Sequence, residues 1–355
     1  MSPDHTHTPA RAFERRILPR VSRTFALTIP QLPVPLRDTV INAYLMCRIA
    51  DTVEDEPTLT AATKRDFQTL FLDAVDDPRK ALRFAGELTP LLSDNMLDAE
   101  RELVEHADQV MATTRALPLR QRTALVRCLR IMCTGMSRFQ TDKSRRGLAT
   151  LGDLKEYCYV VAGVVGEMLT ELFCAHNRDI DAHKAELMER SVAFGRGLQM
   201  TNILKDIWED RDADTCWLPR EVFAQQGFDL TDLSPDRNGR AYQAGLNTLI
   251  GVAHAGLREA LHYTQTIPKR EVGIRRFCLW SIGLAVLTLR KIAGQPDYTA
   301  AQQVKVSRRA VHATILFSNV AGRSNRVIGR VFDRLTRDLP LAPAEPAPMV
   351  RAAQG

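Results

Sequence analysis

Apolar residues recur at intervals of three and four along most of this 355-residue chain, and this spacing limits the possible folds more than any other feature. It is the spacing of an α-helix with one side against a core, whereas a half-buried strand alternates every second residue. We find no run of alternating residues bounded by hairpin turns. The spacing predicts helices over seven segments, residues 39–53, 99–113, 120–139, 154–175, 185–208, 241–263 and 274–292.

The connections between these segments are short, and no linker rich in Pro, Gly or Ser interrupts the middle of the chain. Many apolar-faced helices with short connections predict an all-α, single-domain helical bundle. We place this domain at residues 13–338, after a flexible N-terminal tail at 1–12. Residues 339–355 are rich in Pro and Ala and are expected to form a disordered tail. Residues 142–152 are expected to form a loop.

The net charge of +6 is compatible with nucleic acid, an anionic membrane, an anionic substrate or a solvated basic surface. Aromatic residues make up only 6% of the chain, and no basic run is interleaved with them. This composition argues against a nucleic-acid partner. The seven cysteines contain no C-x-x-C pair, so neither a disulfide framework nor a zinc site is indicated. Without a signal peptide, and with apolar stretches such as 277–289 too short for a bilayer, a cytoplasmic protein is expected.

A narrow polar stripe follows the first of two acidic helices. Tyr44, Arg48, Asp51 and Asp55 lie at offsets of 0, 4, 7 and 11 residues, all within about 40° of the first residue on a helix. The residues between them are mostly apolar, so the remaining faces of this helix are expected to be buried.

The second acidic helix carries Gln199, Asn202, Asp206 and Asp210 on one stripe, and both helices end in D-x-x-E-D. A single copy of this pattern is usually a solvated acidic face. Buried carboxylates, however, are costly unless they are paired or bound to metal. Two such stripes facing each other across a bundle would form a pocket suited to Mg²⁺ and a phosphorylated ligand. The carboxylates of the two D-x-x-E-D segments are Asp51, Glu54, Asp55, Asp206, Glu209 and Asp210.

Cationic side chains near the two stripes suggest how such a ligand is held. Arg23 and Arg48 could grip a diphosphate with their planar donor forks, although Arg23 could equally be a surface residue. Lys205 directly precedes Asp206 and could serve a second diphosphate. An apolar wall would protect a carbocation from water once an allylic diphosphate ionises.

The chain resembles the squalene/phytoene synthase family in five segments that occur in the family's order. They are SRTFA at 22–26, YLMCRIADTVED at 44–55, YCYVVAGVVGEML at 157–169, GLQMTNILKDIWED at 197–210 and WLPREVF at 217–223. The resemblance extends over residues 13–331. The D-T-V-E-D and D-I-W-E-D segments are more similar to those of squalene synthases than to those of phytoene synthases.

This resemblance implies an isoprenoid synthase helical bundle with a central cavity, in which Mg²⁺ binds the diphosphates of two farnesyl or geranylgeranyl donors. It implies that the carboxylates that bind Mg²⁺ and diphosphate are Asp51, Glu54, Asp55, Asp206 and Asp210, and Glu209 is assigned to the metal with them. It implies that Ser22, Arg23, Arg48 and Asn202 line the diphosphate sites, and Gln199 and Lys205 are assigned to substrate binding with them. Tyr44, Tyr157 and Tyr263 are implied near the carbocation, and Arg48 is grouped with them as catalytic. Lys205 stands where the family more often has Arg, which keeps the charge but loses the fork.

The implied reaction joins two farnesyl diphosphates head-to-head through presqualene diphosphate, and NADPH then reduces the intermediate to squalene. No G-x-G-x-x-G fingerprint follows a predicted strand, so the nicotinamide would bind without a Rossmann unit. Residues 304–311 resemble the basic segment that squalene synthases use near the NADPH phosphates, which assigns Lys305 and Arg308 to the cofactor. The alternative is a basic, solvated helix end.

Other functions remain open on the same residues. A phytoene or dehydrosqualene synthase, or a presqualene-diphosphate synthase, would share the fold without NADPH. A non-catalytic helical scaffold would carry solvated acidic stripes, whereas a chain-elongating prenyltransferase should carry D-D-x-x-D, which neither helix has.

The partners and the location are expectations of the same kind. We expect a monomer or weak dimer that can touch the inner membrane face. The basic residues expected to make this contact are Arg323, Arg326, Arg330, Arg334 and Arg337, which could also be a solvated helix face.

Two glycines in the third resembling segment have more than one explanation. Gly163 and Gly166 lie three residues apart in an otherwise apolar helix, where each glycine costs about 1 kcal/mol of helix stability. They indicate close helix packing, room for a long prenyl chain, or a break in the helix.

Overall fold

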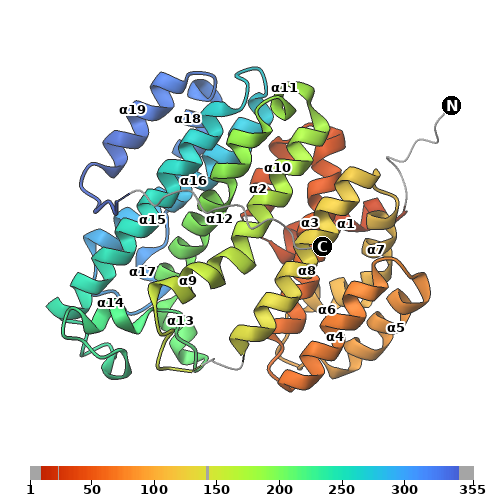
Figure 1. The fold of residues 1–355 in the computed structure, drawn as a ribbon, viewed down its shortest axis with the longest axis horizontal. Helices are drawn as coiled ribbons and strands as arrows, with labels where there is room; N and C mark the ends of the chain where they lie inside the picture. The colour runs from red at the N-terminus through yellow and green to blue at the C-terminus, as the bar shows by residue number, and fades with distance from the viewer. Residues whose placement is uncertain (1–8, 23, 141–143, 344–355) are drawn as a thin grey trace. The chain divides into compact units, whose positions relative to one another are not determined.

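The computed structural model describes residues 9–22, 24–140 and 144–343 (Figure 1). Internal contacts divide the chain into two compact units, each described here by itself. Unit 1 comprises Met1–Lys143 and Glu167–Ala182, and unit 2 comprises Ser144–Gly166 and His183–Gly355. The extent of a single domain over residues 13–338 stays a prediction.

Unit 1 is organised around α3 (Val34–Asp55), which contacts α1, α4, α6, α7 and α8. Leu45, Ile49 and Val53 of α3 are fully buried. The helix ends at Asp55 because Pro57 favours an extended backbone at the preceding residue, Glu56, whose ψ is 114°. The helices packed around α3 are α1 (Pro9–Val21), α4 (Ala61–Ala74), α6 (Asp98–Glu105), α7 (Ala107–Arg115) and α8 (Leu119–Gln140). The unit also contains α2 (Phe25–Thr28), α5 (Pro78–Leu88), α11 (Arg178–Asp181) and most of α10 (Val164–His176).

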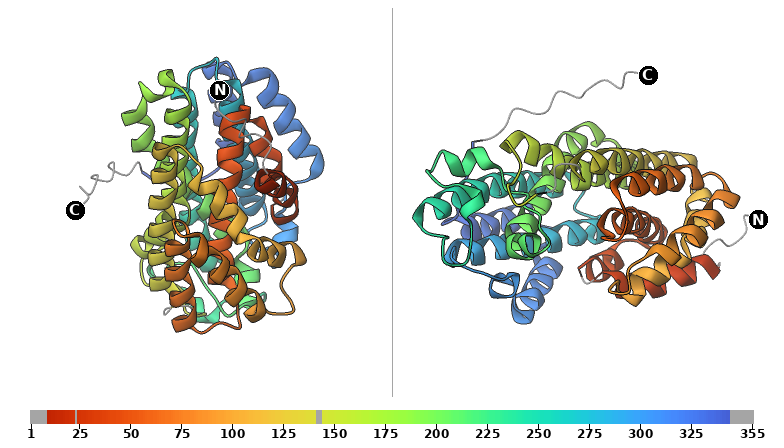
Figure 2. Two further views of the ribbon diagram at one scale, coloured as in Figure 1. Left: turned by 90° about the vertical axis from the view of Figure 1, so that its right-hand side faces the viewer. Right: turned by 90° about the horizontal axis from the view of Figure 1, so that it is seen from below.

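Unit 2 is organised around α12 (Lys184–Lys205), which contacts α9, the π-helical turn η4, α15 and α16 (Figure 2). Its long helices, α15 (Arg240–Thr266) and α16 (Val272–Gly294), also pack against each other. The remaining elements are α9 (Leu151–Cys158), η4 (Tyr159–Gly163), α13 (Ile207–Asp212), α14 (Arg220–Ala224), α17 (Ala301–Val304), α18 (Arg308–Ala321) and α19 (Asn325–Thr336).

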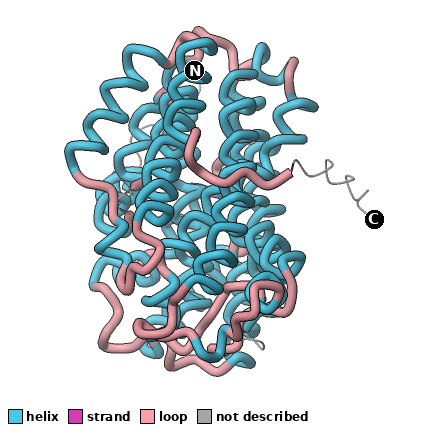
Figure 3. Tube along the Cα trace, turned by 90° about the vertical axis from the view of Figure 1, so that its left-hand side faces the viewer, coloured by secondary structure: helices cyan, strands magenta, loops and turns pink. Residues whose placement is uncertain are grey.

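The all-α prediction is confirmed. The described residues form helices, turns and loops without a strand (Figure 3), apart from one isolated bridge between Leu148 and Pro219. Four predicted helices lie within α3, α8, α15 and α16, and three others are interrupted. The interruptions are at His106 between α6 and α7, at η4 between α9 and α10, and at Asp206 between α12 and α13. The apolar spacing did not predict α1, α4, α5, α18 or α19.

Parts of both predicted tails have regular contacts. Helix α1 begins at Pro9, inside the segment assigned to the N-terminal tail. At the other end, the amide of Ala342 donates to the carbonyl of Gly251 on α15 at 3.1 Å, and Leu339 is buried. Residues 339–343 therefore pack on α15, which approaches them closely because Gly251 has no side chain. The rest of the two tails, residues 1–8 and 344–355, lies outside the described residues, as do 141–143 of the predicted loop.

Two helical stretches, Leu151–His176 and Val272–Gly294, are long and apolar enough to span a membrane by length and composition alone. Their most apolar windows have a mean hydropathy of 1.5, and 50% and 67% of those windows are buried. At 23 residues, α16 is longer than the apolar stretch 277–289, so length alone does not exclude a span. Core helices of a folded domain have the same length and composition, so this is weak evidence.

Helix η4 and helix α12 approach each other at backbone distance. A Cβ added to Gly166 would lie 2.2 Å from the carbonyl oxygen of Ser191, and one added to Gly195 would lie 2.2 Å from that of Ala162. A Cβ on Gly163 would lie 3.2 Å from Val192. The prediction of close helix packing is thus confirmed, and the π-helical geometry of η4 also interrupts the helix at this point, a feature that is frequent at functional sites.

We expect Gly166→Ala to lower the free energy of unfolding by about 1–3 kcal/mol, because the new methyl group cannot fit without moving the α12 backbone. Gly86→Ala is the matched control, since nothing lies within 4 Å of a Cβ at Gly86 in α5. The control should stabilise the helix by about 0.5–1 kcal/mol. Denaturant unfolding of both variants tests this, and equal stability of the two would contradict it.

Candidate active site: two carboxylate clusters

The first carboxylate cluster lies at the C-terminal end of α3 in unit 1. The pKa of Asp51 is raised to about 7, first by burial and then by the negative charges of Asp55, Glu54 and Glu100. Arg48 opposes this shift. Asp51 is therefore a carboxylate whose charged form is disfavoured by burial and by neighbouring carboxylates, and a bound cation would favour that form.

Arg48 is anchored by a residue that the sequence did not reveal. Its Nη2 donates to Oε1 of Glu100 on α6. Burial lowers the pKa of Arg48, but the hydrogen bond and charge of Glu100 raise it more, so the net shift is upward. Nothing in the sequence links positions 48 and 100, because the pair exists only through the packing of α6 on α3.

Glu54 is directed into a buried network. Its side chain accepts a hydrogen bond from Nε2 of Gln68 at 3.4 Å, and the hydroxyl of Ser137 donates to Oε1 of the Gln68 side chain at 2.5 Å. Glu54 is 8% exposed. Its contact with α4 separates it from the stripe shared by Asp51 and Asp55, and its role as a metal ligand stays a prediction.

The start of unit 1 lies beside the same helix. The hydroxyl of Tyr44 donates to the carbonyl of Val21 at 3.0 Å, and the amide of Phe25 donates to Oγ of Ser22 at 3.0 Å. Burial raises the pKa of Tyr44. The side chains of Ser22 and Tyr44 also interact with each other, and their roles at the site stay predictions. Arg23 lies outside the described residues.

The second carboxylate cluster, in unit 2, follows a break in the helix that was predicted to be continuous through residue 208. Helix α12 ends at Lys205 and α13 begins at Ile207. The hydroxyl of Tyr298 donates to the carbonyl of Leu204, which would otherwise accept the amide of Trp208 in an unbroken helix. Trp208 in turn donates through Nε1 to the Tyr298 carbonyl at 2.7 Å. A distant tyrosine thus breaks the helix at Asp206.

Asp206 and Glu209 have different neighbours within this cluster. Nζ of Lys205 lies 3.0 Å from Oδ2 of Asp206, whose pKa is raised by burial against the opposing charge of Lys205. Glu209 accepts a hydrogen bond from the amide of Ala301 at 2.9 Å and so caps α17. The side chain of Asn202 is exposed, and those of Gln199 and Asp210 are partly buried. The ligand roles of these residues stay predictions.

Tyr157 is stacked on Trp217, with ring centroids 3.8 Å apart and an angle of 9° between the planes. The loop before α9 sets this geometry, because Leu148 donates its amide to Leu218 and accepts the amide of Arg220, at 3.0 and 2.8 Å. The stack was not predicted, although Trp217 opens one of the five resembling segments.

The third predicted tyrosine has a different environment. Tyr263 is only 2% exposed and packs edge-on against Phe194, with ring centroids 5.5 Å apart, inside the core of unit 2.

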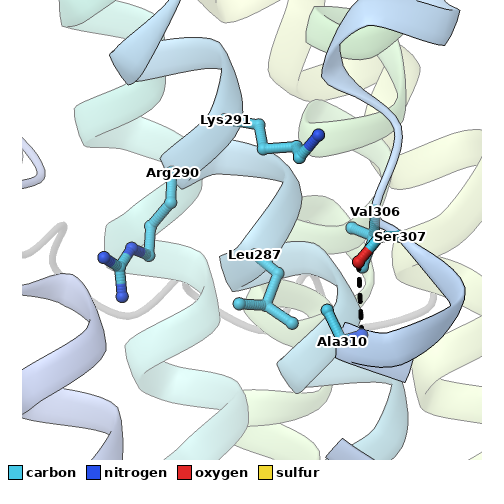
Figure 4. Close-up of a pocket in the computed structure, with 6 residues that line it drawn as sticks. All are labelled: Leu287, Arg290, Lys291, Val306, Ser307 and Ala310. Atoms are coloured by element: carbon cyan, nitrogen blue, oxygen red, sulfur yellow. Dashed lines mark hydrogen bonds between the residues drawn. The ribbon is translucent and has the colours of Figure 1, made fainter. Parts of the chain in front are cut away.

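The basic segment borders an open pocket of about 260 Å³ between the end of α16 and the start of α18 (Figure 4). Lys305 and Arg308 are exposed on either side of Ser307, which caps α18 by accepting the amide of Ala310 at 3.3 Å. Figure 4 shows Lys291 extending from α16 toward Val306 and Ser307. Lys291 is thus a further cation near the predicted cofactor segment, which the sequence did not single out. The pocket is lined by Leu287, Arg290, Lys291, Val306, Ser307 and Ala310.

The carboxylates of both clusters suit Mg²⁺ that is bound by few protein ligands and completed by substrate phosphates and water. Among the described residues, no group of three or more His, Cys, Asp or Glu is arranged to hold a metal ion. Mg²⁺ commonly binds through one or two carboxylates, and substrate phosphates and water complete its shell. Burial is the first cause of the raised pKa of Asp51 and of Asp206, so a bound cation would favour the charged form of each carboxylate.

A family model described as squalene/phytoene synthase matches residues 18–310. The chain belongs to the squalene/phytoene synthase family. This family member is 32% identical over 260 residues to squalene synthase BSS of Botryococcus braunii, covering 72% of this chain and 52% of the relative. It thus spans about half the length of that relative.

Two solved structures share the fold of this family member. One is TcSQS in complex with the ligand BPH1237, with a TM-score of 0.76, 24% identity and coverage of 95% of this chain and 94% of the other. The second is a dehydrosqualene synthase in complex with ligand, with a TM-score of 0.64, 22% identity and coverage of 89% and 97%. At these identities the similarity establishes the fold.

Proposed function

We propose that this chain joins two molecules of farnesyl diphosphate head-to-head through presqualene diphosphate and reduces the product to squalene with NADPH. The observation that carries the proposal is the presence of two carboxylate clusters, in which burial raises the pKa of Asp51 and of Asp206, in a member of this family. Both clusters contain the residues with which the family binds diphosphate through Mg²⁺, which supports that assignment.

Each cluster is assigned the diphosphate of one donor. Asp51 and Asp55 would hold Mg²⁺ in unit 1, and Asp206 and Asp210 would hold it in unit 2. The bound cation would supply charge that stabilises the departing diphosphate. Arg48 is fixed by Glu100, so its guanidinium is held in place before the substrate arrives.

Aromatic side chains are assigned to the carbocation. The stacked pair of Tyr157 and Trp217 presents π-electron density, which attracts a cation through the ring quadrupole. The hydroxyl of Tyr44 is protonated at neutral pH, since burial raises its pKa further above its ordinary value of 10.0. Tyr263, buried against Phe194, supports the core of unit 2 and has the weakest case of the three tyrosines.

The reductive step is assigned to the basic segment before α18. Lys305 and Arg308 would bind the NADPH phosphates, because a 2′-phosphate requires cationic side chains. The capping bond from Ala301 to Glu209 ties α17, which directly precedes Lys305, to the second carboxylate cluster. The cofactor segment and that cluster are therefore connected within unit 2.

The product decides between squalene synthesis and its alternatives. Incubation with farnesyl diphosphate and Mg²⁺ should yield presqualene diphosphate without NADPH and squalene with it. If dehydrosqualene or phytoene forms regardless of NADPH, the reductive assignment is wrong and the non-reductive activity of the family replaces it. If no condensation occurs under any condition, the proposed function as a whole is wrong.

Replacing both Lys305 and Arg308 by Ala should lower squalene formation by about tenfold or more, since two charge-assisted contacts to phosphate are lost. Presqualene diphosphate should accumulate, because NADPH acts only after it forms. Lys269→Ala combined with Arg237→Ala removes two exposed cations elsewhere in unit 2 and is the control. Squalene formed at the parent rate by the Lys305/Arg308 double variant would place the cofactor elsewhere.

A further inference from the structure

Helix α18 packs against α16 on one side only. A Cβ added to Gly283 of α16 would lie 2.5 Å from Cγ2 of Thr314, so the two helices are in direct contact there. Ser318 and Ala321, which follow Thr314 at intervals of four and three residues, are buried. The buried face of α18 therefore packs against α16.

The opposite face of α18 exposes large apolar side chains. Leu316 is 66% exposed and Val320, one helical turn later, is 79% exposed. Arg309, Ala313, Leu316 and Val320 lie at offsets of 0, 4, 7 and 11 residues and are all exposed, so they form one continuous row, here called the α18 stripe. This row is apolar after its first residue and is not the polar face expected of a helix end in water.

A row of arginines follows the α18 stripe in the sequence, from Arg323 along α19. Arg323, Arg326, Arg330, Arg334 and Arg337 are all exposed, and the part of the chain that the structure describes contains no carboxylate in salt-bridge distance of them. Asp333 is the only acidic residue between 305 and 337, and it pairs with Arg258 at 3.5 Å.

The charge of this segment exceeds that of the whole chain. Residues 305–337 contain eight Lys or Arg and one Asp, a net charge of +7, whereas the complete chain has +6. The rest of the chain is therefore close to neutral. The positive charge that composition left unassigned is concentrated on the elements that also expose Leu316 and Val320.

We propose that the α18 stripe and the arginine row together dock the protein onto an anionic lipid bilayer. Apolar side chains with cationic neighbours fit the boundary between acyl chains and anionic head groups, where both kinds of contact are favourable. A second copy of the chain is a poor occupant, because two copies of this strongly basic surface would repel each other. The proposal does not depend on the reaction that the chain catalyses.

Flotation of the full chain with vesicles tests the proposal. The protein should float with vesicles that contain phosphatidylglycerol at low salt, remain unbound with vesicles of phosphatidylcholine alone, and dissociate as salt screens the charges. Leu316→Ser with Val320→Ser should lower binding by about tenfold or more, since two apolar side chains are lost from the interface. Arg326→Gln with Arg330→Gln should lower binding several-fold and weaken its salt dependence.

Matched controls test whether binding requires this surface or only exposed apolar side chains in general. Leu82→Ser and Leu119→Ser remove leucines that are 63% and 79% exposed on α5 and α8, and both should bind like the parent. Unchanged melting temperatures would show that all variants are folded. Absence of flotation at low salt, an equal loss in the controls, or a concentration-dependent dimer that the Leu316/Val320 variant abolishes would each overturn the proposal.

Discussion

Asp51→Asn and Asp206→Asn should each lower the rate of presqualene diphosphate formation by about 10²–10³-fold, while the variants stay folded. Each substitution preserves the shape of the side chain but removes the negative charge that would hold Mg²⁺. The measurement is the initial rate with farnesyl diphosphate and Mg²⁺, with circular dichroism as the check on folding.

Asp236→Asn is the matched control, because Asp236 is exposed in a loop of unit 2 and belongs to neither carboxylate cluster. Its rate should equal that of the parent. Near-normal turnover in both the Asp51 and the Asp206 variant would contradict the assignment of two metal-binding clusters. Loss of activity in only one of them would reduce the site to a single cluster.

Asp51→Asn should lower the catalytic rate but raise the stability of the folded chain at high pH. The pKa of Asp51 is about 7 in the folded chain against 3.8 as its ordinary value, so the folded state binds the proton more tightly. The stabilisation from this proton is complete below pH 3.8 and is lost as the pH rises through 7. Without Mg²⁺, Asp51→Asn should therefore melt at a higher temperature than the parent at pH 8, and the difference should shrink toward pH 4.

The same melting temperatures are then compared with Mg²⁺ and inorganic diphosphate added. They should raise the melting temperature of the parent, because a ligand bound only by the folded state stabilises it. The Asp51 variant should respond less. If the parent melts at a higher temperature than the variant at pH 8 without Mg²⁺, the charged form of Asp51 is not disfavoured by its surroundings.

The helices of the candidate site were predictable because each stripe is a local property of the sequence. Asp51 and Asp55 share a helix face wherever α3 packs, and the burial of Leu45 and Ile49 follows from the same spacing. The break at Asp206 was not predictable in this way. It depends on Tyr298, whose hydroxyl donates to the carbonyl of Leu204, 94 residues earlier in the chain.

The residues that sequence reasoning missed share this dependence on distant contacts. Glu100 reaches Arg48 across 52 positions, and Trp217 reaches Tyr157 only because the loop around Leu148 pairs with residues 218–220. Periodicity describes one helix at a time and contains no information on such pairs. The resemblance to a known family located the segments but not the contacts between their side chains.

Arg275 on α16 should be the most important single polar residue for the stability of unit 2. Its side chain is fully buried, and its guanidinium donates four hydrogen bonds of 2.6–2.7 Å. The acceptors are the carbonyls of Thr264, Ile267 and Gly322 and the side-chain oxygen of Asn325. One cation thereby joins the end of α15, the end of α18 and the start of α19.

We expect Arg275→Met to lower the free energy of unfolding by about 3–5 kcal/mol, because it leaves several buried acceptors without a donor. Arg275→Lys should recover little of this loss, since one ammonium group cannot reproduce a planar fork that serves four acceptors. Arg276→Met is the control: Arg276 makes one long contact of 3.3 Å, to the Asn319 carbonyl, and its loss should cost about 1 kcal/mol or less.

The helices that Arg275→Met destabilises first distinguish loss of the four hydrogen bonds from a general loss of packing. Because three of the acceptors sit where α15 and α18 end, the positive charge of Arg275 also compensates the negative ends of those helices. Hydrogen exchange in Arg275→Met should therefore accelerate first in α18 and α19, before the amides of α12 at the centre of unit 2. Uniform acceleration across unit 2 would mean that Arg275 contributes through packing alone, and a methionine variant as stable as the parent would mean that the four hydrogen bonds contribute nothing.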